Sequence, residues 1–590
     1  MLVLPGATVY FGDLFRSMAV IIGDEFNNLI NGTGKDDTLL GLGGDDVLFA
    51  SRGDDLLDGG AGFDTANYSN FNRKITLKSQ GAINKGSSTD QIADIESIVG
   101  AVGQRNLIDG TVPGGGPARF VIDLSTNDLT VAGIPGLGAV PFKVFNFVDV
   151  NGTVNNDTIV GDVIDNVFGG SQGNDLLDGE GGNDTVDYSN LGAAITLERA
   201  GTVNKGSAGT DQILGIETIV GARGFDNAID GGTGISGTTS FDLDLEAESL
   251  TVNGIPGLGS QSFTVENFVN ATGTSQSDRL VGDRKANVFT GSLGDDFIDG
   301  NRGRDTADYS ALGEAITLRR VGVVDKGTSG TDTLEDIETI IGAVGQSNTI
   351  DGNDPGASGV TSFNVNLAAK KLTVKNIPGL GNARFKVENF TDVIGTVNND
   401  ALVGDDNDNR LVGFFGRDRI SGKGGDDTIL GGSGIDRLFG NDGDDRLRGG
   451  GSNDIVNGGD GDDFLIGVNT TVNRPGFGER DRLIGGSGID IFALGDKDNV
   501  FYSEGGNSDF ATIADLESGL DKILLSGSLS SYVFDNARKQ IFLNGDNGLD
   551  LIAKSQRAFN VNTDFAFTDS SPALTSQVFQ PLPTELQALV

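Results

Sequence analysis

Cysteine, histidine and tryptophan are absent from this chain of 590 residues. Without cysteine it has no disulfides and no thiolate metal sites. Without histidine it has neither a Ser-His-Asp triad nor an H-E-x-x-H zinc site, which leaves carboxylate chemistry as the main route to catalysis. The sequence contains no run of 18 apolar residues, so no membrane helix is expected.

Basic residues are scarce. The chain has 42 Lys and Arg against 84 Asp and Glu, a formal net charge of −42. This charge argues against a nucleic-acid partner, whose phosphates need basic side chains. It suits a solvated polyanion or a protein that binds many cations. The apolar content of 37% is too high and too regular for a disordered chain.

The first 22 residues show no Sec-type signal peptide. No Lys or Arg precedes the apolar stretch, and Pro5, Gly12, Asp13 and Arg16 interrupt it. We therefore expect residues 1–22 to form an N-terminal cap, and we expect any export to proceed without a cleaved N-terminal signal peptide.

A nine-residue period dominates the chain. It follows G-G-x-G-x-D-x-U-x, where U is a large apolar residue, and this pattern is typical of a calcium-binding parallel β-helix. Four arrays carry it, at residues 23–67, 152–187, 273–308 and 395–493 (arrays 1 to 4). Of their 24 nonapeptide frames, 23 have an apolar residue at position 8. The exception, frame 467–475, has Val472 and Arg474 at positions 6 and 8, and we expect it to loop out.

The pattern places oxygen ligands at regular intervals. Glycine at positions 1, 2 and 4 permits sharp turns with accessible carbonyl groups, and Asp at position 6 adds a carboxylate. Carbonyl and carboxylate oxygens are the ligands that the hard Ca²⁺ ion prefers. The candidate metal ligands are the position-6 residues Asn28, Asp37, Asp46, Asp55, Asp64, Asp157, Asn166, Asp175, Asp184, Asp278, Asn287, Asp296, Asp305, Asp400, Asn409, Asp418, Asp427, Asp436, Asp445, Asp454, Asp463, Asp481 and Asp490.

Two nonapeptides make one coil, so position-6 residues 18 apart lie on the same edge, one strand spacing of about 4.8 Å apart. Bare carboxylates at that spacing would repel, which disfavours a metal-free Gly/Asp turn. Asp427 should therefore share an ion with Asp445, and Asp463 with Asp481. Counting such pairs along the four arrays predicts up to about 14 Ca²⁺ ions. The four Asn frames should bind more weakly because an amide carries no charge.

A second period of about 121 residues separates the arrays with three inserts, at 68–151, 188–272 and 309–394 (inserts 1 to 3). Their patterning is that of β-structure, with a hairpin at 119–131 and one strand at 385–390. Three residue types recur in them. We expect core packing for the tyrosines Tyr68, Tyr188 and Tyr309. We expect a structural role for the glutamates Glu96, Glu217 and Glu338. Lys205, Lys326 and the neighbouring Asp325 should lie in solvated loops.

The nonapeptides resemble those of the RTX (repeats-in-toxin, hemolysin-type) calcium-binding proteins exported by type I secretion. The D-Y-S and I-E-x-I elements of the inserts resemble those between arrays of cyanobacterial RTX surface proteins. Residues 508–513, 521–527 and 550–553 resemble the terminal β-domain of such proteins. The resemblance implies a C-terminal β capping domain at 494–556, an uncleaved type I secretion tail at 557–590, and an extracellular or cell-surface location.

The predicted fold is all-β, with parallel β-roll or β-solenoid arrays, three β-rich inserts and a C-terminal β-domain. The favoured function is a secreted protein that folds on binding Ca²⁺ and serves as a structural or adhesive component of the cell surface or matrix. Its expected partners are calcium ions, the type I secretion machinery, and cell-surface polysaccharide or like subunits. The alternative is a secreted enzyme with an unrecognised active site in the inserts. A pore-forming toxin is disfavoured, because it would need a hydrophobic helical region upstream of the repeats, and we find none in this sequence.

Overall fold

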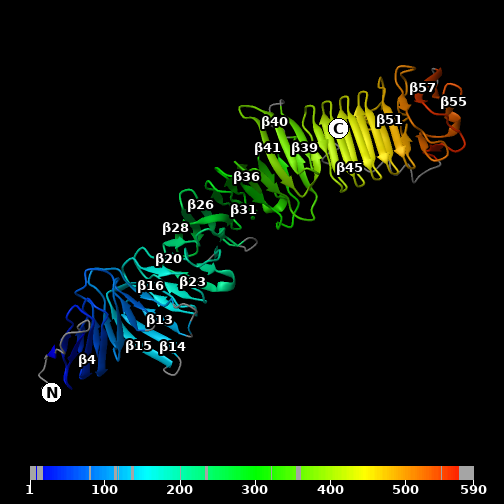
Figure 1. Ribbon diagram of the computed structural model, residues 1–590. Coiled ribbons are helices and arrows are strands. Elements are labelled where there is room, and N and C mark those ends of the chain that lie inside the picture. Colours follow the sequence, from blue (N-terminus) through cyan, green and yellow to red (C-terminus); the bar gives the residue numbers. More distant parts are fainter. Residues whose placement is uncertain are drawn as a thin grey trace. The chain divides into compact units, whose positions relative to one another are not determined.

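The computed structural model describes residues 8–9, 18–78, 81–111, 116, 118–134, 138–198, 201–232, 237–319, 322–353, 361–545 and 548–569 (Figure 1). Most of the predicted N-terminal cap, and the predicted secretion tail beyond residue 569, lie outside the described residues. The chain divides into two compact units, Met1–Asn287 and Val288–Val590. Both are built from β-strands, and the helices in the described part are three single turns, η1 (Gly206–Ala208), η2 (Gly327–Ser329) and η3 (Leu529–Ser531).

Unit 1 holds arrays 1 and 2, inserts 1 and 2, and the start of array 3. Its first strands are β1 (Thr8–Val9), β2 (Ala19–Ile22), β3 (Leu29–Asn31), β4 (Asp37–Gly43), β5 (Val47–Phe49), β6 (Leu56–Ala61) and β7 (Thr65–Asn67). Insert 1 gives β8 (Thr76–Lys78), β9 (Ala82–Asn84), β10 (Thr89–Ala93), β11 (Ser97–Val99), β12 (Asn106–Asp109), β13 (Arg119–Asp123), β14 (Asp128–Ile134), β15 (Gly138–Phe145) and β16 (Phe147–Asn151).

The rest of unit 1 repeats this plan. Array 2 gives β17 (Thr158–Val160), β18 (Val167–Gly169), β19 (Leu176–Asp178) and β20 (Thr185–Asp187). Insert 2 and the start of array 3 give β21 (Thr196–Glu198), β22 (Thr202–Asn204), β23 (Thr210–Leu214), β24 (Thr218–Val220), β25 (Asn227–Asp230), β26 (Ser240–Asp244), β27 (Ser249–Ile255), β28 (Gly259–Glu266), β29 (Phe268–Thr272) and β30 (Arg279–Val281).

Unit 2 begins with the remainder of array 3 and insert 3. These strands are β31 (Val288–Thr290), β32 (Phe297–Asp299), β33 (Thr306–Asp308), β34 (Thr317–Arg319), β35 (Val323–Asp325), β36 (Thr331–Glu335), β37 (Thr339–Ile341), β38 (Asn348–Asp351), β39 (Ser362–Asn366), β40 (Lys371–Ile377), β41 (Gly381–Glu388) and β42 (Phe390–Ile394).

Array 4 and the C-terminal region complete unit 2, and array 4 forms the stack of parallel arrows around β45 and β51 in Figure 1. The array strands are β43 (Ala401–Val403), β44 (Arg410–Phe415), β45 (Arg419–Gly424), β46 (Thr428–Ser433), β47 (Arg437–Asp442), β48 (Arg446–Gly451), β49 (Ile455–Asp460), β50 (Phe464–Val468), β51 (Arg482–Ser487) and β52 (Ile491–Ala493). The last strands are β53 (Ala511–Ile513), β54 (Lys522–Leu525), β55 (Tyr532–Asp535), β56 (Gln540–Gly545), β57 (Gly548–Ser555) and β58 (Phe565–Phe567).

Each unit is a solenoid in which successive array strands alternate between two sheets. In array 4, β44, β46, β48, β50 and β52 pair in parallel in one sheet, and β43, β45, β47, β49 and β51 pair in parallel in the other. The register places position 8 of one coil against position 8 of the next, as in Ile429 beside Leu447. All 23 apolar position-8 residues are at most 5% exposed. The predicted apolar stack is therefore the core between the two sheets.

The inserts continue the solenoid of their unit. In insert 1, β10, β11 and β12 pair in parallel with β6, β7 and β8, and β13 pairs in parallel with β17 of array 2. Each insert adds antiparallel hairpins to this parallel frame, as in β13–β14–β15. The predicted hairpin at 119–131 is confirmed. The predicted strand at 385–390 is wrong in one respect, because Asn389 adopts a left-handed φ of 61° and separates β41 from β42.

In the described part of the chain, no helix has the length and hydrophobicity needed to span a bilayer.

Candidate metal centres

The position-6 residues line up along the edges of each solenoid. Of the 23 candidate ligands, 22 are at most 4% exposed, and Asn28 is half-buried. One hydrogen bond links consecutive members. The backbone N–H of Asp427 donates to Oδ1 of Asp445 at 2.8 Å, and the N–H of Asp445 donates to Oδ1 of Asp463 at 2.9 Å. The same bond joins residues 18 apart in arrays 1 and 2, as from Asp46 to Asp64 at 2.7 Å. The structure thus brings the predicted partners together one coil apart.

This hydrogen bond occupies one carboxylate oxygen and leaves the other without a protein donor. Within the described ranges, ten position-6 aspartates have a buried Oδ2 that accepts no hydrogen bond. They are Asp46, Asp64, Asp184, Asp418, Asp427, Asp436, Asp445, Asp454, Asp463 and Asp490. A buried carboxylate oxygen without a partner loses its hydration and gains nothing in return. A cation beside each of these oxygens would remove that cost.

A backbone carbonyl lies close to the unpartnered oxygen in most of these frames. A Cβ atom built on Gly440 would approach both Oδ2 of Asp445 and the carbonyl oxygen of Gly458 to under 3.0 Å. The same holds for Gly431, with Asp436 in its own frame and Gly449 one coil on. Position 1 must therefore be glycine, because the space between the carboxylate and the carbonyl group leaves no room for a Cβ atom. That convergence of oxygens is the donor set expected for Ca²⁺.

Burial also perturbs the acidity of these groups. Desolvation raises the pKa of Asp445 to about 7 and that of Asp418 to about 8. It raises the pKa of Asp454 to about 9, and the nearby Asp481 carboxylate adds to this shift. Without a counter-ion these side chains favour the protonated form, since burial and like charge both penalise the anion. A divalent cation would restore the ionised form.

The residues present fit a calcium ion better than a softer metal. No group of three or more acidic side chains in the described part of the chain could hold a metal by itself. Ligands must therefore combine single carboxylates from successive coils with backbone carbonyl groups. Flexible, oxygen-only coordination of this kind suits Ca²⁺, which would supply positive charge at the edge of the solenoid.

The family of the RTX calcium-binding nonapeptide repeat (4 copies) matches the chain six times, at residues 31–66, 151–186, 272–307, 394–429, 430–465 and 475–509. These segments fall on all four arrays. All four arrays therefore carry RTX calcium-binding nonapeptide repeats. The resemblance inferred from the nonapeptides is thereby confirmed, whereas the similarity to cyanobacterial surface proteins is not. Comparison with curated proteins finds no match to the chain.

Position 2 distinguishes two kinds of RTX turn. In every frame with an unpartnered Oδ2, position 2 has a left-handed φ between 62° and 136°. These residues are Leu42, Gly60, Glu180, Phe414, Lys423, Gly432, Asn441, Gly450, Gly459 and Gly486. A non-glycine residue pays roughly 1–2 kcal/mol for this conformation. Leu42 and Phe414 adopt this conformation at turns with an unpartnered carboxylate oxygen, so these turns are the candidate metal-binding type.

The second kind of turn satisfies its own carboxylate. In these turns position 2 is Ser or Thr. We call the edge of the solenoid that they form the hydroxyl edge. They contain Thr33, Ser51, Thr153, Ser171, Thr274, Ser292 and Thr396. The backbone N–H of Thr153 donates to Oδ2 of Asp157 at 2.6 Å, and the Thr153 hydroxyl contacts the same carboxylate. The hydroxyl of Ser171 donates to Oδ2 of Asp175 at 3.1 Å. Calcium was predicted at these carboxylates, yet protein donors already contact them.

The Asn frames are also satisfied by their own turns. Oδ1 of Asn28 accepts the backbone N–H of Asp24 at 2.7 Å, and its amide donates back to the Asp24 side chain at 3.1 Å. Asn409 makes the same pair of bonds with Asp405. Oδ1 of Asn166 likewise accepts the backbone N–H of Asp162 at 2.9 Å, whereas its amide donates to the Val148 carbonyl one coil away at 2.9 Å. Local hydrogen bonds thus occupy the amide oxygens predicted as weak ligands.

One predicted pair is wrong. The N–H of Asp454 donates to Oδ1 of Asp481 at 2.7 Å, and that of Asp463 donates to Oδ1 of Asp490 at 3.1 Å. Both steps span 27 residues, so Asp463 does not pair with Asp481. Frame 467–475 loops out as expected, but a looped-out nonapeptide moves the pairing of all later frames by nine residues. The hydroxyl of Tyr502 also donates to Oδ2 of Asp481, at 2.6 Å.

The inserts supply ladder residues that the nonapeptide pattern did not reveal. The N–H of Asp64 donates to Oε2 of Glu96 at 2.8 Å, and Glu217 and Glu338 accept the same bond from Asp184 and Asp305. On the hydroxyl edge, acidic residues of the inserts extend the series in the same way. They are Asp90, Asp211 and Asp332. Their sequence signal is recurrence once per 121-residue period, and the structural role expected for the glutamates agrees with their contacts.

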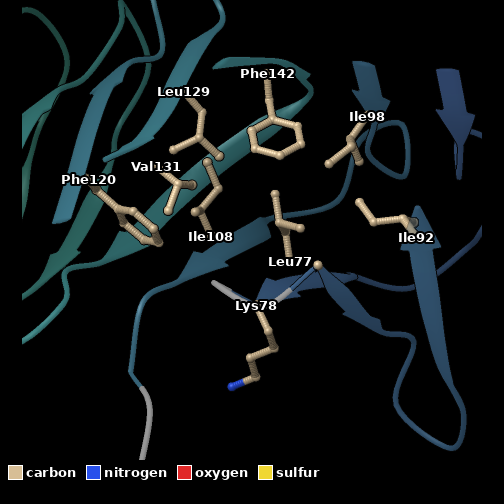
Figure 2. Close-up of a pocket in the computed structure, with 10 residues that line it drawn as sticks. Leu77, Lys78, Ile92, Ile98, Ile108, Phe120, Leu129, Val131 and Phe142 are labelled. Atoms are coloured by element: carbon tan, nitrogen blue, oxygen red, sulfur yellow. The ribbon is translucent and has the colours of Figure 1, made fainter. Parts of the chain in front are cut away.

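Two inserts each enclose a small apolar cavity between a hairpin and the adjoining strands. In insert 1 it measures about 30 Å³, and Leu77, Ile108, Phe120 and Phe142 contribute to its lining (Figure 2). The cavity in insert 3 measures about 10 Å³. Holding one water takes at least about 10–15 Å³ on this measure. These cavities are packing gaps, because neither has room for a substrate.

Proposed function

We propose that the chain is a secreted calcium-binding repeat protein that folds when it meets Ca²⁺ outside the cell, and that it serves as a structural or adhesive component of the cell surface or matrix. The observation that carries the proposal is the ladder of buried carboxylates with unpartnered oxygens, such as Asp427 and Asp445. RTX repeat proteins are typically secreted. Secretion would expose this ladder to calcium, which could then bind it.

Calcium controls folding in this proposal through the cost of the empty ladder. In the cytosol the sites are empty, the buried carboxylates are unsatisfied, and the chain stays largely unfolded, which suits passage through the type I secretion machinery. Extracellular calcium modules bind with affinities of about 10⁻⁴–10⁻³ M, so the ions bind after export. Ions that bind only the folded state stabilise it by mass action.

The structural or adhesive role is supported by the large share of the chain that forms solenoids. Arrays and inserts join in continuous solenoids, and extended solenoids offer long repetitive surfaces for binding. Cell-surface polysaccharide and further copies of the chain are the partners that such surfaces suit. We propose no catalytic role, since the recurring acidic residues of the inserts are engaged in the ladder, as Glu217 and Asp211 show.

The decisive experiment is a far-UV circular dichroism titration of calcium-depleted protein with Ca²⁺, with Mg²⁺ as the control ion. We expect a cooperative transition from coil to β-structure near 0.1–1 mM Ca²⁺, about the range of extracellular sites. A β-spectrum that calcium depletion leaves unchanged would contradict calcium-triggered folding.

The role at the surface needs a separate measurement. Sedimentation velocity of calcium-loaded protein, with and without cell-surface polysaccharide, should show self-association or a shift on adding the polymer. A chain that stays monomeric and unbound in both samples would contradict the role at the surface. Hydrolysis of ester, peptide or glycoside substrates would argue for the enzyme alternative.

A further inference from the structure

Three buried lysines close the hydroxyl edge where an array meets its insert. Lys85, Lys205 and Lys326 are at most 2% exposed, although Lys205 and Lys326 were expected in solvated loops. Each follows a short strand of its insert, β9, β22 or β35, in the recurring sequence [ND]-K-G-[ST]. A lysine is almost never fully buried unless it is paired. These three side chains must therefore have a specific role.

Oxygen atoms surround each ammonium group. Nζ of Lys85 donates to the carbonyl oxygens of Ser51 and Gly53, both at 2.8 Å. It also lies 3.4 Å from Oδ2 of Asp55 and contacts Oδ1 of Asp90. The set comprises carbonyl groups from positions 2 and 4, the position-6 carboxylate, and the carboxylate of the next ladder residue. A calcium ion in an RTX turn would need this combination of oxygens.

The arrangement repeats in the other two inserts. Nζ of Lys205 donates to the Ser171 carbonyl at 2.7 Å, lies 3.3 Å from Oδ2 of Asp175, and contacts Asp211. Nζ of Lys326 does the same with a matching set of residues, Ser292 at 2.7 Å, Asp296 at 3.2 Å and Asp332 at 2.5 Å. Two carboxylates and a carbonyl group therefore converge on an ammonium in each of the three periods.

A tyrosine completes each cluster from the core side. The hydroxyl of Tyr68 donates to Oδ2 of Asp90 at 3.0 Å, and Tyr188 and Tyr309 donate to the corresponding aspartates at 2.8 Å. All three tyrosines are fully buried, as expected for core aromatics. Each carboxylate oxygen of the insert aspartate, such as Asp90, thus accepts a hydrogen bond. This contrasts with Asp184 on the opposite edge, whose Oδ2 accepts no hydrogen bond from the described residues.

We propose that Lys85, Lys205 and Lys326 take the place of a calcium ion, so that the hydroxyl edge of arrays 1 to 3 is closed without metal. Calcium in these arrays is then confined to the opposite edge, and array 4, which has no such lysine in its described turns, depends on calcium along both edges. The proposal rests on the proposed calcium-binding function. It places fewer ions on the chain than the pairs counted from the sequence.

Two aspartates of array 2 provide a matched test in the full-length protein. Asp175 lies on the hydroxyl edge and Asp184 on the opposite edge, nine residues apart. Bound Ca²⁺ per chain is measured by equilibrium dialysis at millimolar Ca²⁺ for the natural protein, Asp175→Asn and Asp184→Asn. We expect Asp184→Asn to lose at least one ion and Asp175→Asn to keep the natural count. Loss of an ion from Asp175→Asn, equal to that from Asp184→Asn, would overturn the proposal.

Removing the lysines tests the substitution directly. In the triple variant Lys85→Ala, Lys205→Ala, Lys326→Ala, two carboxylates and at least one carbonyl group face each vacated position. We expect the variant to bind three more Ca²⁺ ions per chain than the natural protein. Lys143→Ala is the control, because Lys143 is partly exposed and pairs with exposed Asp128, and its ion count should not change.

The outcomes separate this proposal from the proposed function. A folded triple variant with the natural ion count would overturn the substitution while leaving calcium binding intact. If the triple variant does not fold, the comparison of Asp175→Asn with Asp184→Asn decides. A natural protein that binds no Ca²⁺ at millimolar concentration would instead refute the proposed function.

Discussion

The backbone N–H of Asp427 donates a 2.8 Å hydrogen bond to Oδ1 of Asp445, across one coil of array 4. This bond fixes the carboxylate one strand spacing away and turns its second oxygen toward the turn glycines. Because Oδ2 of Asp445 is buried and accepts no hydrogen bond within the described chain, the metal-free fold carries an unsatisfied acceptor at each such step. We therefore expect dependence on calcium to follow from the spacing of the repeat.

Replacing Asp445 should weaken calcium binding in array 4. In Asp445→Asn the amide can still accept the N–H of Asp427, but the negative charge is lost. We expect one fewer bound ion, or about a tenfold weaker site, equivalent to about 1.4 kcal/mol. Isothermal titration calorimetry measures both quantities. The control is Asp442→Asn, which makes the same change at an exposed residue of the same frame. Equal effects from the two variants would show that general charge, not the ladder, governs affinity.

Glycine at position 1 should be indispensable where oxygens converge. A methyl group on Gly179 would lie within 3.0 Å of both the Gly215 carbonyl and Oδ2 of Asp184. Gly179→Ala should therefore displace a ligand, abolish calcium binding at this turn and lower the thermal midpoint of calcium-loaded protein. Gly181→Ala in the same frame is the matched control, because a Cβ there meets nothing within 4 Å. Calcium binding and melting that do not differ between the two variants would refute the ligand assignment.

Much of this arrangement could be predicted from the sequence, because a strict nine-residue period fixes which side chains point inward and which form turns. Position 8 was correctly assigned to the core, and position 6 to the edges. The difference between the two kinds of turn was missed, since it depends on φ at position 2, where Leu42 and Phe414 adopt a conformation that favours glycine. The burial of Lys205 could not be predicted, because two of its partners, Ser171 and Asp175, lie 34 and 30 residues earlier in the chain.

Acidity should have opposite effects on the calcium-free and calcium-loaded protein. In the metal-free fold the pKa of Asp418 is raised to about 8 and that of Asp463 to about 8, from 3.8. The folded state then binds more protons than the unfolded chain. The stabilisation is complete below pH 3.8 and is lost as the pH rises through 8. Calcium-free protein, which is largely unfolded at pH 8, should therefore gain β-structure at pH 5.

With calcium bound the order should reverse, because protons compete with the ion for the same carboxylates. Far-UV circular dichroism of resin-depleted protein and thermal melts of calcium-saturated protein, each at both pH values, measure the two effects. The variant Asp418→Asn, Asp463→Asn should show a weaker acid stabilisation in the metal-free state. Metal-free natural protein that gains no β-structure at pH 5 would contradict the raised pKa values.

The looped-out nonapeptide offers the sharpest test of pairing in array 4. Deleting residues 469–477 joins Val468 to Gly478 and creates a regular frame, GVGERDRLI, with Asp481 at position 6. Asp454 then lies 18 residues from Asp481, as in every regular coil, so both partners found in the structure are retained. We expect the deletion to keep the natural number of bound ions. It should cost some stability, since Tyr502 donates its backbone N–H to the Pro475 carbonyl.

Deleting residues 440–448 is the matched control, because it removes nine residues of a regular frame together with Asp445. That deletion should lower the ion count by at least one. If Asp463 instead paired with Asp481, Asp454 and Asp490 would each face Val472 in the natural protein. Deleting 469–477 would then replace that one pair with two, Asp454 with Asp481 and Asp463 with Asp490, and the ion count would rise. Equilibrium dialysis of the two deletions therefore distinguishes the pairing seen in the structure from the pairing that uniform spacing predicts.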